Sequence, residues 1–319
     1  MRVDDSVTSS VVFLGIEDDT PSKGGIDCIG TGFLLGYEDV GYLITARHVA
    51  KDLHNLPFRI RINKVDGTSG NLDADEIEWT YHPDSNVDLA AIVFHMHGPT
   101  HGYECVYIPE ELLFDHVLAS REGIGIGDIC YAVGLFRVLA GRERNLPVVH
   151  TGNLALIPGD ERIPVRDWDD PLQQRVRQVE GYLVAMSTLS GLSGSPVFVR
   201  PVVDTKAKDI HGTQTIVRMP RHDIYLLGVW QSSWEAPPSE VLALEHGHPV
   251  RVPVGMGVVV PLARIKEVLE MPNLKAEREA ARAAGEYPAS TASRLRPGRC
   301  DNQFCRRENR LVRPWRRKA

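Results

Sequence analysis

The sequence lacks the features that characterise disulfide-rich, membrane-spanning and secreted proteins. Its 319 residues include five cysteines, an odd number at irregular spacing, so no disulfide framework is indicated. No segment reaches the roughly 18 apolar residues that a membrane-spanning helix needs. Asp4 and Asp5 stand where a secretory signal would be basic. We therefore expect free thiols, no association with a membrane, and a cytoplasmic location.

An excess of positive charge is also absent, except at one end. The net charge of −6 does not favour a nucleic-acid-binding protein. From Arg294 onward, ten Lys and Arg against two Asp and Glu give +8, which leaves −14 for the preceding residues. From Gly285 the chain is polar and contains proline, so we expect a disordered basic tail. Its arginines, with Phe304 and Trp315, offer at most weak contact with nucleic acid or an acidic partner.

Long stretches of helical periodicity are missing from the first 270 residues. Short apolar runs rich in β-branched residues take their place, separated by Gly, Pro and Asp; examples are residues 10–14, 42–44, 58–62, 90–94, 129–133 and 225–230. Many short strands are typical of an all-β sandwich or barrel. Helical spacing begins only at residues 261–269, and residues 275–284 form a second helix candidate with little apolar face.

The most informative segment is residues 190–196, Ser-Gly-Leu-Ser-Gly-Ser-Pro. Glycines around a serine, followed by proline, favour a tight loop over a helix or a regular strand. A nucleophilic serine needs such a loop, because its hydroxyl must be accessible and amide donors must lie beside it to hold an oxyanion. Ser193 is the preferred candidate, and Ser190 and Ser195 are alternatives by composition.

Two upstream segments supply a base and a carboxylate. Residues 45–49 read Thr-Ala-Arg-His-Val and residues 86–90 read Asn-Val-Asp-Leu-Ala. A serine hydroxyl needs a neighbouring base at neutral pH, and an imidazole titrating near pH 6.5 can serve. We predict that His48 is this base and that Asp88 accepts the other ring N–H. Asp84 is the rival carboxylate, but the apolar strand begins directly after Asp88.

These three segments, in the order His, Asp, Ser, resemble the chymotrypsin-like (trypsin-like) serine peptidases, from about residue 10 to about residue 270. Residues 45–48 match the family's Thr-Ala-x-His, and Asp88 opens an apolar strand as the family's aspartate does. Residues 191–196 match Gly-x-Ser-Gly-Gly-Pro, with Ser195 in the second glycine place. This Ser-Gly-Ser-Pro variant is similar to bacterial members such as glutamyl endopeptidases.

The resemblance implies an all-β fold of two six-stranded antiparallel β-barrels with a C-terminal helix. The first barrel would span residues 1–118 and carry His48 and Asp88. The second would span residues 119–272 and carry Ser193, with the site in the cleft between the barrels. Residues 273–319 would be helical and then disordered.

The resemblance also implies an oxyanion hole made by the backbone N–H groups of Gly191 and Ser193. The residues implied for the specificity pocket are Ser187 at its base and Gln231, Ser232, Ser233 and Gly257 along its walls. The base has no carboxylate, so we expect a preference for an uncharged side chain rather than for Lys or Arg. Gln231 stands where the family often has a serine that supports the aspartate.

Leu192 departs from the family pattern. Digestive and clotting members have an aspartate before the nucleophile, which binds the new amino terminus made by zymogen cleavage. A leucine cannot form that ion pair. We therefore expect no activation of that kind, and either a competent enzyme or one controlled by a regulatory protein partner or a loop rearrangement.

Our leading interpretation is a serine endopeptidase that cleaves polypeptides through an acyl-enzyme and needs no metal or organic cofactor. The alternative is a catalytically silent module of the same fold that binds proteins. A metal-dependent hydrolase built on His95, His97 and His101 has no coherent ligand spacing.

Other motifs are weaker. Cys300 and Cys305 form one potential zinc-ligand pair without a second pair. Gly123, Gly125 and Gly127 lack the strand-to-helix context of a dinucleotide-binding loop, so a turn is the better interpretation.

Overall fold

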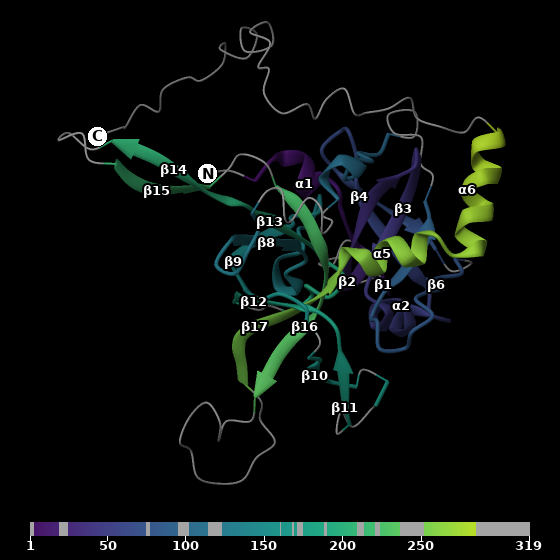
Figure 1. Cartoon of the computed structure of the whole chain (residues 1–319). Helices are drawn as coiled ribbons and strands as arrows, with labels where there is room; N and C mark the ends of the chain where they lie inside the picture. Colours follow the sequence, from purple (N-terminus) through teal and green to yellow (C-terminus); the bar gives the residue numbers. More distant parts are fainter. Residues whose placement is uncertain are drawn as a thin grey trace, which may run out of the picture. The chain divides into compact units, whose positions relative to one another are not determined.

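The computed structural model in Figure 1 describes residues 3–18, 25–74, 77–94, 102–113, 123–159, 161–167, 169–170, 175–187, 190–208, 214–220, 224–236 and 252–284. All of them belong to one compact unit, Met1–Pro288. The predicted disordered tail and the predicted barrel boundary between residues 118 and 119 lie outside the described residues. Among the described helices, none is both long and apolar enough to cross a membrane.

The N-terminal half forms an antiparallel sheet of seven strands in the order β5-β4-β1-β2-β3-β7-β6. The strands are β1 (Val11–Asp18), β2 (Gly25–Tyr37), β3 (Val40–Thr45), β4 (Phe58–Asn63), β5 (Ser69–Asp73), β6 (Thr80–Tyr81) and β7 (Ala90–Val93). Helix α1 (Asp5–Ser9) precedes β1, and helix α2 (Arg47–Leu53) follows β3. The short strand β6 pairs only with β7.

Both faces of the inner strands of this sheet are buried, which explains their continuous apolar runs. Side chains alternate between the faces of a strand. Along β1, Val12 and Leu14 therefore pack in the cluster that includes Val49 of α2. Val11 and Phe13 point to the other face, into a larger cluster that continues into the C-terminal half. The two halves thus share one hydrophobic core.

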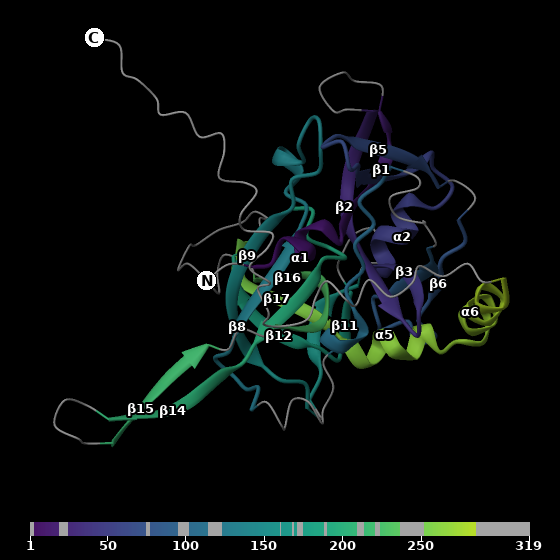
Figure 2. The ribbon, with the colours of Figure 1, turned by 90° about the horizontal axis from the view of Figure 1, so that it is seen from above.

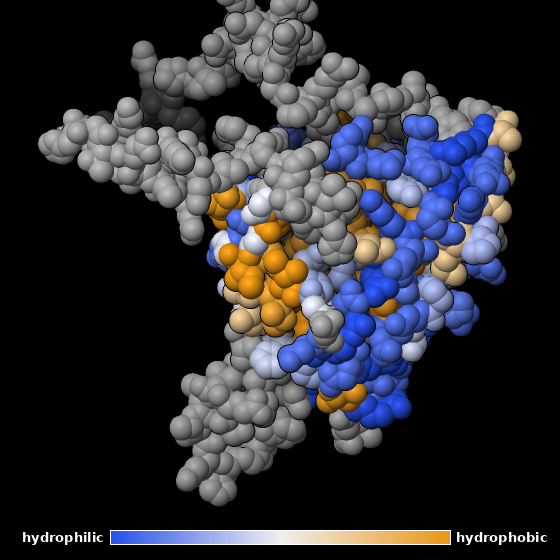
Figure 3. Space-filling model, viewed as in Figure 1, coloured by the Kyte–Doolittle hydropathy of each residue, from blue (hydrophilic) through white to orange (hydrophobic). Residues whose placement is uncertain are grey.

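The C-terminal half contains a closed six-stranded barrel in the order β12-β17-β16-β13-β8-β9 (Figure 2). Its strands are β8 (Ile129–Gly134), β9 (Val148–Leu156), β12 (Tyr182–Met186), β13 (Pro196–Arg200), β16 (Tyr225–Ala236) and β17 (Val252–Pro261). Closure leaves no unpaired strand edge. In Figure 3 the surface over α2 and β6 is mostly hydrophilic, whereas an apolar area lies over β9 and β12.

The fold prediction is confirmed in the mostly β content, the closed six-stranded barrel and the C-terminal helices. The N-terminal half differs from the expected six-stranded barrel, because it is a sheet of seven strands with β5 and β6 at its ends. Helix α5 (Leu262–Leu269) occupies the segment where helical spacing begins. Helix α6 (Pro272–Ala284) starts three residues before the predicted one. Proline is favourable at a first helical position because its missing N–H has no helical partner there.

Two antiparallel hairpins lie outside the sheet and the barrel. One is formed by β10 (Ile163–Arg166) and β11 (Val176–Val179). The other is formed by β14 (Val202–Lys208) and β15 (Gln214–Pro220). Two single 3-10 turns, η3 (Glu110–Leu112) and η4 (Arg137–Leu139), complete the described elements.

Helix α6 docks through Leu274, which joins the hydrophobic core, and through one buried guanidinium. Arg278 is 1% exposed and donates hydrogen bonds to the Tyr42 hydroxyl at 3.2 Å and the Leu269 carbonyl at 2.9 Å. It also forms ion pairs with Glu38 and Glu270, each at 3.0 Å. These contacts show how a helix with little apolar surface packs against the N-terminal sheet.

We expect Arg278→Met to lower the free energy of unfolding by about 2–4 kcal/mol, because a buried hydroxyl and a buried carbonyl lose their donor. Urea denaturation monitored by fluorescence measures this change. Arg282→Met is the matched control on the same helix: Arg282 is 43% exposed and pairs with Glu38, so its loss changes stability by at most about 1 kcal/mol. Equal effects of the two substitutions would contradict the assigned role of Arg278.

Candidate functional site

The pairing of β3 with β7 brings His48 next to Asp88. The ladder sets Thr45 opposite Ala90, and the chain leaves β3 directly into α2, whose second residue is His48. Asp88, two residues before β7, is fully buried. Its Oδ2 lies 2.7 Å from His48 Nδ1, and its Oδ1 accepts the His48 backbone N–H at 2.9 Å. Both carboxylate oxygens therefore fix the same histidine.

This contact sets the protonation behaviour of His48. Burial by itself lowers the pKa of the imidazole, but the charge of Asp88 and its hydrogen bond outweigh burial and raise that pKa above 6.5. Donation of the Nδ1 proton to Asp88 leaves Nε2 as the proton acceptor of the neutral ring. The side chain stays 23% exposed, so the ring is accessible from one side.

The segment that carries Ser193 lies between β12 and β13 and is held by both halves of the protein. Thr31 on β2 donates its backbone N–H to the Ser193 carbonyl at 2.9 Å and its hydroxyl to the Gly191 carbonyl at 2.7 Å. Gly194 donates its N–H to the Trp230 carbonyl on β16 at 2.9 Å. Within the described part of the chain, the N–H groups of Gly191 and Ser193 have no acceptor. These are the two donors expected for an oxyanion hole.

Two glycines let this loop take its shape. Gly191 has φ +105°, and a Cβ there would lie 2.9 Å from Leu135 Cγ. Gly194 has φ +86°, and a Cβ there would lie 2.1 Å from the Thr31 carbonyl oxygen and 2.4 Å from Thr45 Oγ1. Only glycine combines this backbone conformation with so close an approach.

The Ser193 hydroxyl donates its hydrogen bond to the Gln231 carbonyl on β16, at 3.2 Å. Among the described residues, the imidazole of His48 bonds to Asp88 and not to Ser193. A serine side chain has three staggered orientations, so the direction of the hydroxyl is a choice of rotamer. The structure thus joins His48 to Asp88 directly and shows Ser193 with its hydroxyl turned to β16.

The alternative residues lie elsewhere. Ser195 is fully buried against Gly134, and Ser190 is exposed. Asp84 accepts the Asn86 N–H at 2.9 Å within its own turn. The structure therefore brings Asp88, and not Asp84, to His48.

The residues expected to line the pocket lie on neighbouring strands. Ser232 pairs with Val258, and Ser233 with Gly257, in the β16–β17 ladder. A Cβ at Gly257 would overlap the Trp230 ring, with 2.0 Å to its Cη2, so this glycine makes room for the indole. Ser187 is exposed and follows β12, which pairs with β17. The side chain of Gln231 is buried, and its two amide atoms have no partner among the described residues.

Leu192, which stands where the resembling family has an aspartate, is buried. It is 1% exposed and belongs to the shared hydrophobic core. Its carbonyl accepts the Ser195 N–H at 2.9 Å, which closes the turn around Ser193. Apolar burial, in place of an ion pair, anchors this side of the loop.

The remaining candidates are the possible metal ligands, the glycine-rich segment and the cysteine thiols. His95, His97, His101, Cys300 and Cys305 lie outside the described residues, and the described residues contain no group of three potential metal ligands. Gly123 and Gly127 form turns with positive φ, as expected. Burial raises the pKa of Cys28 to about 11, that of Cys105 to about 11 and that of Cys130, with a contribution from Asp128, to about 12. These thiols stay protonated at neutral pH.

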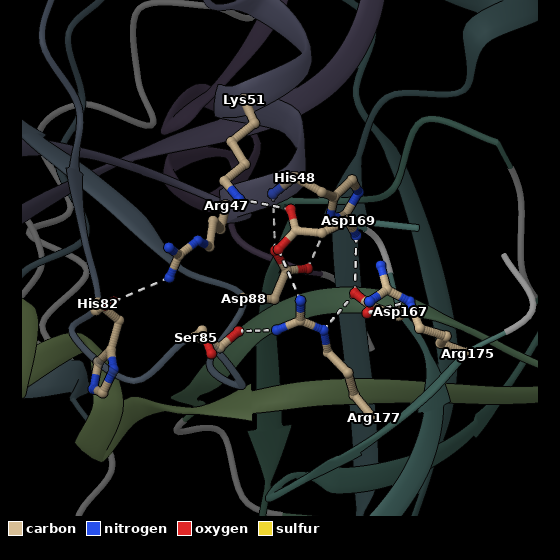
Figure 4. A network of polar contacts seen from close by, with 10 residues as sticks. All are labelled: Arg47, His48, Lys51, His82, Ser85, Asp88, Asp167, Asp169, Arg175 and Arg177. Atoms are coloured by element: carbon tan, nitrogen blue, oxygen red, sulfur yellow. Dashed lines mark hydrogen bonds and ion pairs between the residues drawn. The ribbon is translucent and has the colours of Figure 1, made fainter. Parts of the chain in front are cut away.

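The sequence analysis missed two groups of residues at the site. One is Thr31, which ties the serine loop to β2. The other is a network of Asp167, Asp169, Arg175 and Arg177 with Lys51, around the His48–Asp88 pair (Figure 4). The concentration of acidic and basic residues from 166 to 177 was its only signal in the sequence.

Comparison with known proteins finds distant likeness among solved structures. No protein-family model and no curated protein matches the sequence. The solved structures with some likeness include the Rv3671c protease from M. tuberculosis in its active form, at 16% identity over 83% of this chain and 81% of that chain, with a TM-score of 0.43. The inactive form of that protease gives 14% identity, 83% and 89% coverage and a TM-score of 0.41. At these scores the likeness carries no argument, so the fold and site rest on the strand order and geometry described above.

The raised pKa of His48 predicts a pH-dependent stability. The folded state binds the imidazole proton more tightly than the unfolded state, so the stabilisation is complete below pH 6.5 and is lost as pH rises through the folded-state pKa. The stability difference between wild type and His48→Gln should fall across this window by about 1.4 kcal/mol per unit of pKa elevation. Urea denaturation at a series of pH values measures it; a difference that grows with pH contradicts the assignment.

We also expect Gly194→Ala to destabilise the protein more than Gly67→Ala. Gly67 has a similar φ, +88°, but a Cβ there meets nothing within 4 Å. Gly67→Ala therefore measures the backbone term alone, about 1–2 kcal/mol. The clash with Thr31 should add roughly 1–3 kcal/mol at Gly194. If both substitutions lower the free energy of unfolding equally in urea denaturation, the serine loop accommodates the added Cβ without a clash.

Proposed function

We propose that the protein is a serine endopeptidase with His48, Asp88 and Ser193 as its catalytic triad. The observation that carries the proposal is the contact of 2.7 Å between His48 Nδ1 and a fully buried Asp88. A buried carboxylate that orients an imidazole is what general-base activation of a serine requires. The two free N–H groups of Gly191 and Ser193 add the donors that an oxyanion needs.

In the proposed reaction, the Ser193 hydroxyl rotates from the Gln231 carbonyl toward His48 Nε2. It attacks the carbonyl carbon of the scissile peptide bond while His48 takes its proton. The N–H groups of Gly191 and Ser193 stabilise the oxyanion, and Asp88 stabilises the imidazolium. His48 then protonates the leaving amine. Water attacks the acyl carbonyl carbon while His48 takes its proton, and His48 returns that proton to the Ser193 oxygen as the acid product leaves.

The same proposal covers specificity and control. Ser187, Ser232 and Ser233 carry no charge, which favours an uncharged substrate side chain beside them. The buried Leu192 removes the aspartate that zymogen activation needs, so control would come from a regulatory partner or from the rotamer of Ser193. We propose a cytoplasmic enzyme with a polypeptide substrate.

A second candidate is a catalytically silent module of the same fold that binds a protein. The hydrogen bond from Ser193 to Gln231, in place of one to His48, favours it. The buried His48–Asp88 pair favours the enzyme, because a binding surface gains nothing from an ionised carboxylate hidden behind it.

A fluorophosphonate probe, which reacts covalently with activated serines, separates the two candidates. We expect wild type to be labelled, and Ser193→Ala and His48→Ala to lose labelling by at least about a thousandfold, because triad residues act as a unit. Ser190→Ala and Ser195→Ala should be labelled like wild type. Absence of labelling in folded wild-type protein would favour the binding module.

A further inference from the structure

Hairpin β10–β11 packs against the barrel, and its residues also contact the helix that carries His48 through Asp169 and Lys51. Ile163, Val165 and Val179 pack with Val258 of β17. Trp234 of β16 donates its indole N–H to the Pro164 carbonyl at 2.9 Å. The hairpin is therefore anchored to the strands that carry Gln231, Ser232 and Gly257.

Arg177 on β11 connects this hairpin to the N-terminal half. Its Nη1 donates to the Ser85 carbonyl at 2.6 Å, its Nε to an Asp167 carboxylate oxygen at 2.5 Å and its Nη2 to Asp169 Oδ2 at 2.8 Å. Its side chain is only 15% exposed. A guanidinium that binds three acceptors in a fixed planar fork orients them as well as neutralising them.

Asp169 extends the network to the helix of His48. Its Oδ1 lies 2.6 Å from Lys51 Nζ, and Lys51 is three residues after His48 in α2. Burial by itself raises the pKa of Asp169, but the hydrogen bond and charge of Lys51, with the charges of Arg177 and Arg47, lower it below its usual value. Figure 4 shows Lys51, Asp169 and Arg177 around the His48–Asp88 pair.

The turn before Asp88 is held at two points by the C-terminal half. Arg177 binds Ser85, three residues before Asp88. At the start of the turn, His82 lies with Nε2 2.8 Å from Glu267 of α5. Arg47, at the start of α2, donates to the His82 carbonyl at 3.1 Å, which ties the turn to the helix.

We propose that Arg177 is a positioning residue that holds α2 and the turn of residues 82–88 so that His48 and Asp88 face Ser193. This inference rests on the proposed function. Arg177 forms none of its described hydrogen bonds with the triad, so it acts through Ser85 and through Asp169 to Lys51. The triad is divided between a sheet and a barrel, and a misplacement of about 1 Å between reacting groups can slow a reaction about a hundredfold.

The test compares Arg177→Met with Arg59→Met in the full chain. Arg59 on β4 is a matched control: its side chain is 14% exposed and pairs with Glu17 and Asp73, and β1 and β2 separate β4 from β3. If Arg177 formed only a structural ion pair, the two substitutions would change the labelling rate equally. We expect the limiting rate of fluorophosphonate labelling to fall about 10–100-fold in Arg177→Met, with half-saturation unchanged, and to stay within about twofold of wild type in Arg59→Met.

Two further variants refine the test. Lys51→Met removes a cation that is 38% exposed, so it does not threaten folding, and should slow labelling about 2–5-fold. Because Lys51 acts through Asp169, the double variant with Arg177→Met should label no more slowly than Arg177→Met alone. Arg177→Lys should recover only part of the rate, since an ammonium cannot hold three acceptors in one plane.

A readout that needs no catalysis separates this inference from the proposed function. The Nδ1 proton of His48, shared with Asp88, should give a far-downfield proton resonance in wild type and in Arg59→Met. We expect exchange with water to remove it in Arg177→Met. If wild type is not labelled, the proposed function fails and this resonance alone decides the inference.

The inference is overturned if folded Arg177→Met keeps both the wild-type labelling rate and the wild-type resonance. It is equally overturned if the rate and resonance change as much in Arg59→Met. If Arg177→Met does not fold, Lys51→Met decides: a loss of rate with an unchanged melting temperature supports the inference, and an unchanged rate with an unchanged resonance overturns it.

Discussion

The burial of the Asp88 carboxylate is the constraint on which the rest of the site depends. An ionised group removed from water is tolerated only when it is well hydrogen-bonded. Asp88 meets this condition by binding the ring and the backbone N–H of one residue, His48. The junction of β3 with α2 and the start of β7 must therefore keep their present register. The ladder that pairs Thr45 with Ala90 ensures this.

The serine loop, residues 190–196, is held by both halves of the protein. Its carbonyls are bound by Thr31 of the N-terminal sheet, and its Gly194 N–H is bound by Trp230 of the barrel. Leu192 packs into the core that both halves share. Among the described residues, the N–H groups of Gly191 and Ser193 have no acceptor, whereas those of Gly194 and Ser195 are bound. Long-range tertiary contacts thus set the shape of a short segment.

The cross-contacts of Arg177 and Lys51 could not have been predicted from the sequence. Lys51 and Asp169 are 118 residues apart, and Arg177 and Ser85 are 92 apart. No periodicity or motif connects such positions, and a cluster of alternating charges usually indicates a solvated surface. The hairpin β10–β11 was equally hidden, since its strands, Ile-Pro-Val-Arg and Val-Arg-Gln-Val, contain no continuous apolar run. The orientation of the Ser193 hydroxyl depends on a rotamer, which sequence does not specify.

The sequence by itself determined the local structure: short β-branched runs became strands, the segment at residues 261–269 became helix α5, and glycines marked the turns at positions 191 and 194. It also identified His48, Asp88 and Ser193 as the residues to examine, because their neighbours have recognisable local patterns. The tertiary structure decided which carboxylate meets His48, how the halves share a core, and what the Ser193 hydroxyl binds. The physical reason is that strand propensity and turn chemistry act over a few residues, whereas burial of a charge and satisfaction of its hydrogen bonds depend on groups that only the folded chain brings together.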